Sequence, residues 1–389
     1  MTPLFDILIL TRYKALYKKP QDLCKVCHFL NINVLIFTPE YVMLTLIDLN
    51  IKKNGGNIMD VKEYLTPYKY KKPIISPKEN SFSSKGVDCP FLFRHNGKFY
   101  MMHIGFDGIG YQTALCTSDD LIHWQEEGVI LKRGCHKEWD KVGMAGVWIL
   151  KDCDLYGTNE LIKVDGKYWL FYHSYPNEGY ENGAAMVGLA YTEDENLLDW
   201  NFVDEPIFVP CDDGTWDSGG LYKTSVIRYD DKYYMFYNAK DMVNGPWKEQ
   251  TGVAVSTDML HWERYENNPL LPTKEGTWMD KFVSDPCITY DSKNKLWALF
   301  FFAYDSHHAR EGVATGKDFF NLQVYDKPII DVGKHGEIDS THAHKPGIIY
   351  HNGALWHFYC SVRPTATGDE RKSFGSEYRC ITVARSTPF

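Results

Sequence analysis

One pattern of apolar and polar positions recurs five times along the chain. In each copy an apolar run leads into a short turn rich in Gly, Asp or Asn, and an aromatic-rich run follows. Runs of β-branched and aromatic residues on both sides of such a turn are typical of a β-hairpin. The predicted hairpins span residues 90–105, 159–174, 224–239, 286–303 and 346–361.

Further apolar runs follow the hairpins and predict two more strands in each of the first four copies. Third strands are clearest at residues 113–124, 187–200 and 252–262. Four strands in each unit, at a spacing of roughly 50 to 60 residues, are typical of the blades of a β-propeller. The predicted fourth strands are residues 126–133, 204–210, 267–273 and 326–332.

The fifth copy ends after three strands, and a segment near the start of the chain resembles the strand that it lacks. Residues 71–76 repeat the Lys-Pro-Ile-Ile pattern of residues 326–331. A strand from the N-terminal side would close the ring and leave no open blade. We therefore predict an all-β, five-bladed β-propeller over residues 66–389. A β-sandwich or two separate β-domains would explain five matching copies less well.

Residues 1–58 do not share this pattern. They end in Gly55-Gly56 shortly before Met59, and this dipeptide can be encoded by a ribosome-binding sequence. We therefore hypothesise that translation starts at Met59 and that residues 1–58 are a non-native or disordered extension. Cys24-x-x-Cys27-His28 matches a haem-attachment motif, but no export signal accompanies it. We interpret the match as chance and expect no cofactor.

Charge and hydropathy exclude several partners. The chain carries 42 Lys and Arg against 51 Asp and Glu, a net charge of -9, so nothing favours binding to nucleic acid or to an anionic membrane. Polar residues interrupt the most apolar stretch, residues 31–49, so no membrane span is predicted. Without a leader pattern, we expect a cytoplasmic protein whose ten cysteines are reduced thiols. No sequence signal indicates an oligomeric state.

The predicted topology brings many polar residues to one rim of the propeller. The start of each first strand, each loop between strands 2 and 3, and each link between blades share that rim. Two carboxyl groups can cleave a glycosidic bond there, one as proton donor and one as base or nucleophile. Candidate catalytic residues are Asp88, Asp217, Asp285 and Glu249. Candidate substrate contacts are Asp107, Glu181, Trp216, Lys223, Lys240, Gln250, His342, His344 and Arg363.

Three short motifs carry a family resemblance. VDCPFLF, VSDPCITY and STDMLHW, within the five-blade pattern, resemble the family 43 glycoside hydrolases and the related families 32, 62, 117 and 130. The resemblance covers nearly all of residues 66–389 and implies that Asp88 is the general base or nucleophile. The sequence departs from the family pattern in blades I, II and III. Asp-Cys-Pro replaces Asp-Pro, only Glu160 lies near the blade II aspartate, and Asp217 replaces the expected proton-donating glutamate.

We predict an exo-acting glycosidase for short oligosaccharides. Asp88 is the predicted base, Asp217 or Glu249 the acid, and Asp285 a carboxylate that orients groups or sets pKa values. Two alternatives stay open. A non-catalytic propeller that binds glycans would explain the missing blade III glutamate. A phosphorylase, which the resemblance to family 130 suggests, would use the cations predicted on the rim, Lys223, Lys240, Arg310, Lys345 and Arg363.

The pair His342-x-His344 allows a further role. Alternate residues of a strand point to one side, so both imidazoles lie together. The pair resembles the histidine proton donor proposed for family 117, but substrate contact and core hydrogen bonding explain it equally well. A metal is not predicted, because no Cys or carboxylate at ligand spacing completes a site.

Overall fold

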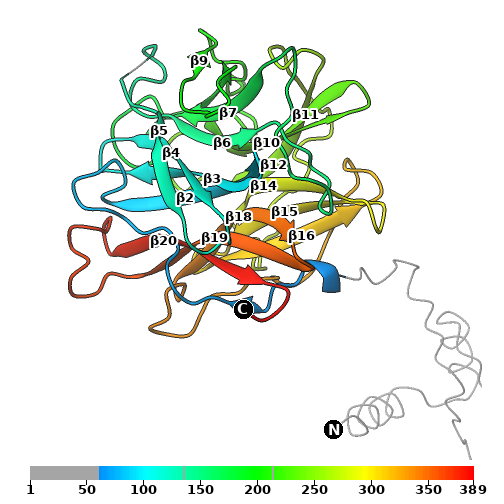
Figure 1. The fold of residues 1–389 in the computed structure, drawn as a ribbon. Helices are drawn as coiled ribbons and strands as arrows, with labels where there is room; N and C mark the ends of the chain where they lie inside the picture. Colours follow the sequence, from blue (N-terminus) through cyan, green and yellow to red (C-terminus); the bar gives the residue numbers. More distant parts are fainter. Residues whose placement is uncertain (1–60, 135, 213) are drawn as a thin grey trace, which may run out of the picture. The chain divides into compact units, whose positions relative to one another are not determined.

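The computed structural model describes residues 61–134, 136–212 and 214–389. Predictions for residues 1–58, including the start at Met59 and the Cys24–His28 motif, lie outside the described residues. The described part is all-β and forms a five-bladed propeller, which confirms the predicted fold class (Figure 1). No helix in this part has the length and apolar character that crossing a bilayer requires.

Each blade is an antiparallel sheet of four strands, with the first strand innermost. Blade I contains β2 (Gly86–His95), β3 (Lys98–Phe106), β4 (Tyr111–Ser118) and β5 (Gln125–Leu131). Blade II contains β6 (Ala145–Ile149), β7 (Tyr168–Ser174), β8 (Met186–Thr192) and β9 (Asn201–Phe202). Blade III contains β10 (Gly220–Tyr229), β11 (Lys232–Lys240), β12 (Glu249–Ser256) and β13 (Glu263–Arg264). Blade IV contains β14 (Phe282–Asp291), β15 (Leu296–Tyr304), β16 (Ala309–Gly316) and β17 (Gln323–Val324).

The start of the described chain completes blade V, as predicted, but the strand is Tyr68–Lys69 and not residues 71–76, where Ile75 forms only a single bridge. It contains β18 (His342–His351), β19 (Ala354–Pro364), β20 (Glu377–Arg385) and the short outer strand β1 (Tyr68–Lys69). β1 pairs antiparallel with β20, and the Ile74 N–H donates to the Ile381 carbonyl at 2.8 Å. This pairing covers the edge of β20 and closes the ring.

Blade II differs from the prediction in its inner strand. β7 forms as expected, but it pairs with β6 and not with residues 159–164. β6 is apolar and entirely buried, so it takes the inner position. The segment that connects β6 to β7 is an insertion, in which Glu160 and Leu161 form only single bridges. This insertion lies at the hairpin end of the blade, beside Arg94, so Glu160 lies away from the rim where the inner strands begin.

A β-bulge interrupts the inner strand of every blade close to the rim. In blades I, IV and V a proline follows the bulge residue and offers no N–H to the ladder. The residue before each proline has a positive φ, of 50°, 54° and 68° respectively. The bulge residues of blades I to V are Cys89, Val147, Lys223, Asp285 and Lys345.

Aromatic residues of the second strands pack between the blades. Tyr172, Tyr237 and Tyr359 are fully buried, and each donates its hydroxyl to an aspartate of the preceding link. The acceptors are Asp140 at 2.8 Å, Asp217 at 3.2 Å and Asp339 at 2.9 Å. Seven cysteines in the described part are free thiols. The cytoplasmic location stays a prediction.

The short 3-10 helix η1 (Lys62–Tyr64) packs against the core, so the packed domain includes residues before 66. The Tyr64 hydroxyl donates to Asp291 Oδ2 at 2.6 Å, and its ring meets Phe300 edge to face at 5.9 Å. Because Tyr64 is only 1% exposed, its ring and hydroxyl both contribute to stability.

Replacing Tyr64 with alanine should lower the free energy of unfolding by about 3 to 5 kcal/mol, because a buried aromatic ring is lost. Urea denaturation followed by far-UV circular dichroism measures this difference. Tyr68→Ala is the matched control, since Tyr68 is 44% exposed and should cost less than about 1 kcal/mol. Equal losses for both variants would show that η1 does not stabilise the propeller.

Candidate active site

A cavity of about 320 Å³ opens on the rim where the inner strands begin. Four of the five bulge residues line it, namely Cys89, Lys223, Asp285 and Lys345. All four are at most 8% exposed, so they form a closed floor of charged and thiol groups around the axis. The charged side chains Glu181, Glu249, Glu377 and Arg379 also line the cavity, together with His173, His342, His344, Tyr175, Tyr180, Tyr222 and Trp247.

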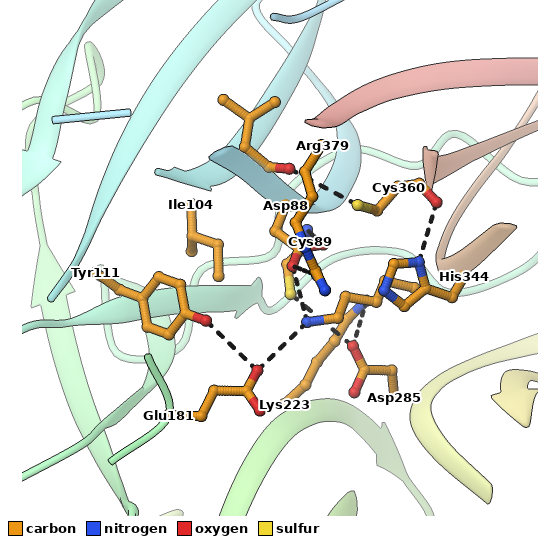
Figure 2. Close-up of polar contacts among 12 residues, drawn as sticks. Asp88, Cys89, Ile104, Tyr111, Glu181, Lys223, Asp285, His344, Cys360 and Arg379 are labelled. Atoms are coloured by element: carbon orange, nitrogen blue, oxygen red, sulfur yellow. Dashed lines mark hydrogen bonds and ion pairs between the residues drawn. The ribbon is translucent and has the colours of Figure 1, made fainter. Parts of the chain in front are cut away.

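The floor is held by ion pairs between blades I and V. Lys345 Nζ lies 2.9 Å from Asp88 Oδ2, and Arg379 contacts the same oxygen at 3.4 Å (Figure 2). Burial opposes ionisation of Asp88, but these two cations outweigh it and hold the pKa of the carboxyl well below its ordinary value. Asp88 itself precedes the bulge, and it is Cys89 that reaches the cavity. The residue of blade I equivalent to Asp285 is therefore Cys89.

Glu181 faces the floor from the loop between strands 2 and 3 of blade II. Its Oε1 lies 3.8 Å from Lys345 Nζ and 3.4 Å from the Tyr111 hydroxyl (Figure 2). Its φ is 48°, a backbone conformation that costs energy for a residue with a side chain. Such strained residues cluster at functional sites.

Glu249 is a buried carboxyl group on the wall of the cavity. It is 6% exposed and receives hydrogen bonds from Trp247 Nε1 at 2.9 Å and from the Ser284 hydroxyl at 2.8 Å. Both donors are neutral. Burial, followed by the nearby charge of Glu181, raises the pKa of Glu249 to about 7. A carboxyl group with this pKa can give up a proton near neutral pH.

Asp285 is the floor residue next to Glu249. The Ser284 hydroxyl is 3.2 Å from Asp285 Oδ1 and also contacts Glu249, so one donor links the two carboxyl groups. Asp285 Oδ2 lies 4.0 Å from Lys223 Nζ and 3.9 Å from Cys89 Sγ. Burial raises the pKa of Asp285, although the neighbouring lysines oppose this shift.

One group of possible metal ligands occurs within the described ranges. Ligand atoms of Asp88, His344 and Cys360 all lie within 4.8 Å of one another. The group suits a metal poorly, because Lys345 and Arg379 already neutralise Asp88 and would repel a divalent cation. His344 Nδ1 is 3.1 Å from the Cys360 carbonyl, and burial holds its pKa well below the ordinary value. His344 is therefore a neutral group of the cavity wall.

Known proteins share this fold and part of this sequence. Residues 156–337 match the glycosyl hydrolases family 32 N-terminal domain. A solved complex of BT0996 and RGII contains a protein 28% identical to this one, with 85% of this sequence and 94% of the other covered and a TM-score of 0.72. Another solved structure, described as a glycoside hydrolase, is 27% identical over 84% of this sequence and 93% of its own, with a TM-score of 0.69.

The protein belongs to the superfamily of five-bladed propeller glycoside hydrolases and phosphorylases. A curated relative within this superfamily is the 1,2-beta-oligomannan phosphorylase of Thermoanaerobacter sp. (strain X514), 26% identical over 195 residues. That match covers 49% of this chain and 52% of the relative, so the chain spans about half the length of this curated protein. The predicted superfamily is confirmed.

The structure brings six of the predicted site residues to the cavity, and Asp88 directly behind it. The six are Glu181, Lys223, Glu249, Asp285, His342 and His344. Lys240 is buried behind the wall, with Nζ 4.8 Å from the centre of the Trp247 ring. The other predicted residues contact neighbours elsewhere: Asp107 pairs with Arg133 at 2.6 Å, Gln250 accepts from the Thr273 N–H, and Arg363 pairs with Asp369 at 2.6 Å.

Asp217 and Trp216 also lie away from the cavity, in a structural motif that the propeller repeats. Asp217 is 1% exposed and pairs with Arg264 at 2.6 Å, while Trp216 stacks on Tyr237 at 5.6 Å. Trp139-Asp140 makes the equivalent contacts in blade II. An aspartate that accepts the same tyrosine hydrogen bond in several blades stabilises the fold. A comparison of the internal copies would therefore have separated Asp217 from the site.

Several cavity residues were not predicted from the sequence. Trp247, Glu377 and Arg379 lie in or beside loops without a recognisable motif, so no sequence signal pointed to them. Cys89 did carry a signal, because it precedes Pro90 as Asp285 precedes Pro286. Aligning the residues before these prolines identifies Cys89, and not Asp88, as the inward-facing residue.

Asp217→Ala should lower the free energy of unfolding by about 3 kcal/mol, because Arg264 and the Tyr237 hydroxyl lose a buried partner. The control is Asp280→Ala in the corresponding link of blade IV, where Met279 takes the place of Asp217 and Asp280 pairs with the neighbouring Lys281 at 3.6 Å. Chemical denaturation of both variants tests this. A stable Asp217→Ala protein without activity would instead place Asp217 in the chemistry.

Proposed function

We propose that the protein is an exo-acting glycoside hydrolase in which Glu249 is the general acid. The observation that carries the proposal is the environment of Glu249: it lines the cavity, is buried, and accepts hydrogen bonds from neutral donors, and its burial raises its pKa to about 7. A buried carboxyl that keeps its proton near neutral pH can protonate the glycosidic oxygen as the bond to the sugar breaks.

Glu181 is the proposed base or nucleophile. The second group of the pair must be an ionised carboxylate, and Glu181 Oε1 lies beside the Lys345 ammonium and the Tyr111 hydroxyl, both donors to an anion. Its charge also contributes to the raised pKa of Glu249, which requires the two groups to be near neighbours. Two carboxyl groups whose surroundings differ in this way divide the roles of acid and base.

Asp285 and Asp88 support this pair in the proposed mechanism. Asp285 shares the Ser284 hydroxyl with Glu249, so its negative charge disfavours loss of the acid's proton. Asp88 holds Lys345 and Arg379 in place behind the floor. Both act as positioning residues, and Asp88 is not the preferred base because two cations occupy its carboxylate.

The shape of the cavity supports exo cleavage. Buried bulge residues close its floor, and a volume of about 320 Å³ suits one or two sugar rings at the lower end of known ligand sites. A closed floor admits the end of a glycan and excludes the middle of one. A candidate substrate is RGII, which is part of the solved complex of the similar protein BT0996.

Hydrolysis is preferred over phosphorolysis because each cation of the cavity already faces a carboxylate. The distances are 4.0 Å for Lys223–Asp285, 2.9 Å for Lys345–Asp88 and 2.8 Å for Arg379–Glu377. Inorganic phosphate would have to enter among these carboxylates and Glu249. Phosphorolysis stays the second candidate, because the curated relative is a phosphorylase.

Glu249→Gln should lower kcat on RGII oligosaccharides about 10² to 10⁴-fold, because glutamine cannot donate the acid proton. Glu181→Gln should cause a loss of similar size, since the ionised partner is removed. Anion-exchange chromatography quantifies the product sugar in the presence and absence of inorganic phosphate. Gln250→Glu, next to Glu249 but outside the cavity, is the control and should keep near-normal activity. An absolute requirement for phosphate would replace hydrolysis with phosphorolysis.

The pH dependence follows from the direction of the Glu249 shift. An acid must be protonated to act, and a pKa raised to about 7 keeps Glu249 protonated below that pH. Activity should therefore fall as the pH rises through about 7. The pH profile of kcat/KM for the wild type measures this basic limb. A profile that stays flat well into the alkaline range would contradict the assignment of Glu249 as the acid.

A further inference from the structure

Three aromatic rings form a continuous row along one side of the cavity, from blade III to blade IV. The ring planes of Trp247 and Phe282 differ by 7°, with centroids 6.5 Å apart, and the centroid of Tyr304 lies 5.1 Å from that of Phe282. All three line the cavity and are only half-buried. By contrast, Tyr111 and Tyr175 elsewhere on the wall are at most 5% exposed.

The fold does not require a large ring at position 282. Phe282 pairs with Tyr304 at the first position of the inner strand, where β2 and β10 have Gly86 and Gly220. In blades I and III these glycines form the first backbone pair of the inner strand without contributing a side chain. The blade fold therefore does not require the side chain of Phe282, and this side chain lines the cavity.

The row begins at the general acid. Trp247 Nε1 donates to Glu249 Oε1 at 2.9 Å, and the backbone of Phe282 pairs directly with that of Glu249. An acid of a glycosidase lies at the oxygen that joins the cleaved sugar to its leaving group. With the cleaved sugar on the polar floor, the leaving group has to lie on the far side of Glu249, where the rings are exposed.

We propose that the row Trp247, Phe282 and Tyr304 is the binding site for the leaving-group sugar. This inference rests on the proposed function and deepens it: the leaving group is a sugar ring that stacks its apolar face on the aromatic row, and not a small alcohol. Aromatic side chains offer such a flat apolar surface, and a hydroxyl such as that of Tyr304 adds a hydrogen-bonding edge.

Kinetics on two substrates with the same cleaved sugar test the proposal. The wild type first identifies the sugar that it releases from RGII oligosaccharides. The glycosyl fluoride of that sugar then serves as the second substrate, because fluoride is too small to reach the row. Phe282→Ala should lower kcat/KM on the oligosaccharides roughly tenfold, the size expected for one aromatic contact, and leave kcat/KM on the fluoride unchanged.

Phe282→Leu and Tyr304→Ala provide second variants in case Phe282→Ala folds poorly, and both should show the same selective loss. Phe374→Ala is the matched control, since Phe374 is 40% exposed and does not line the cavity. Equal losses on both substrates, or no loss on the oligosaccharides, would overturn the leaving-group site while the hydrolase assignment stands. If the wild type releases no sugar from RGII oligosaccharides, the proposed function fails, and the leaving-group site fails with it.

Discussion

The inner strands of this propeller stop pairing shortly after they begin, and the site depends on that interruption. A proline has no N–H for the neighbouring strand, so the ladder bulges, and the residue before the proline turns out of the sheet. This device recurs in blades I, IV and V, and the bulges of four blades each bring one side chain to the cavity. Three of these side chains are charged, namely Lys223, Asp285 and Lys345. The backbone, and not the loops, therefore determines the floor of the cavity.

The charges on this floor depend on one another. Lys345 faces both Asp88 and Glu181, and Arg379 joins Asp88 to Glu377. Because a buried charge without a partner is costly, no member of such a network can be removed alone without penalty. Glu249 lies outside the network and is held by neutral donors. Burial without a cationic hydrogen-bond partner raises the pKa of Glu249, whereas the two cations lower the pKa of Asp88.

Repetition made the fold predictable from the sequence. Five copies of a hairpin pattern and the matching Lys-Pro-Ile-Ile segments predicted the blades and the closure of the ring from the N-terminal side. The outer strands of blades II to V were placed a few residues too late, because the predicted segments form only single bridges and the strands lie just before them. The predicted inner strand of blade II was wrong, because residues 159–164 fit the hairpin pattern better than the true strand β6 does. The insertion that separates Ile149 from Tyr168 has no counterpart in the other blades. Periodicity therefore located four of the five inner strands.

The site was less predictable, because its chemistry depends on bulges and on loop positions. An offset of one residue decides whether Asp88 or Cys89 reaches the axis, and hydrophobic periodicity does not show such an offset. Asp217 carries the carboxyl group expected of an acid, yet it pairs with Arg264 from the outer strand of the same blade and does not reach the cavity. Glu249 was chosen correctly as a cavity residue, but its burial among neutral donors depends on Trp247 and Ser284, which the sequence did not connect to it.

Blades III and IV are joined by a single parallel backbone pair, between Glu249 and Phe282. In the described part of the chain this pair merges the two blades into one sheet of eight strands. The position of Glu249 is therefore fixed by two blades at once, whereas the loop that carries Trp247 is attached to only one of them. Loops around the opening can thus change between relatives without displacing the backbone of Glu249. Substrate specificity, which depends on the loops, can therefore evolve separately from the reactivity of Glu249.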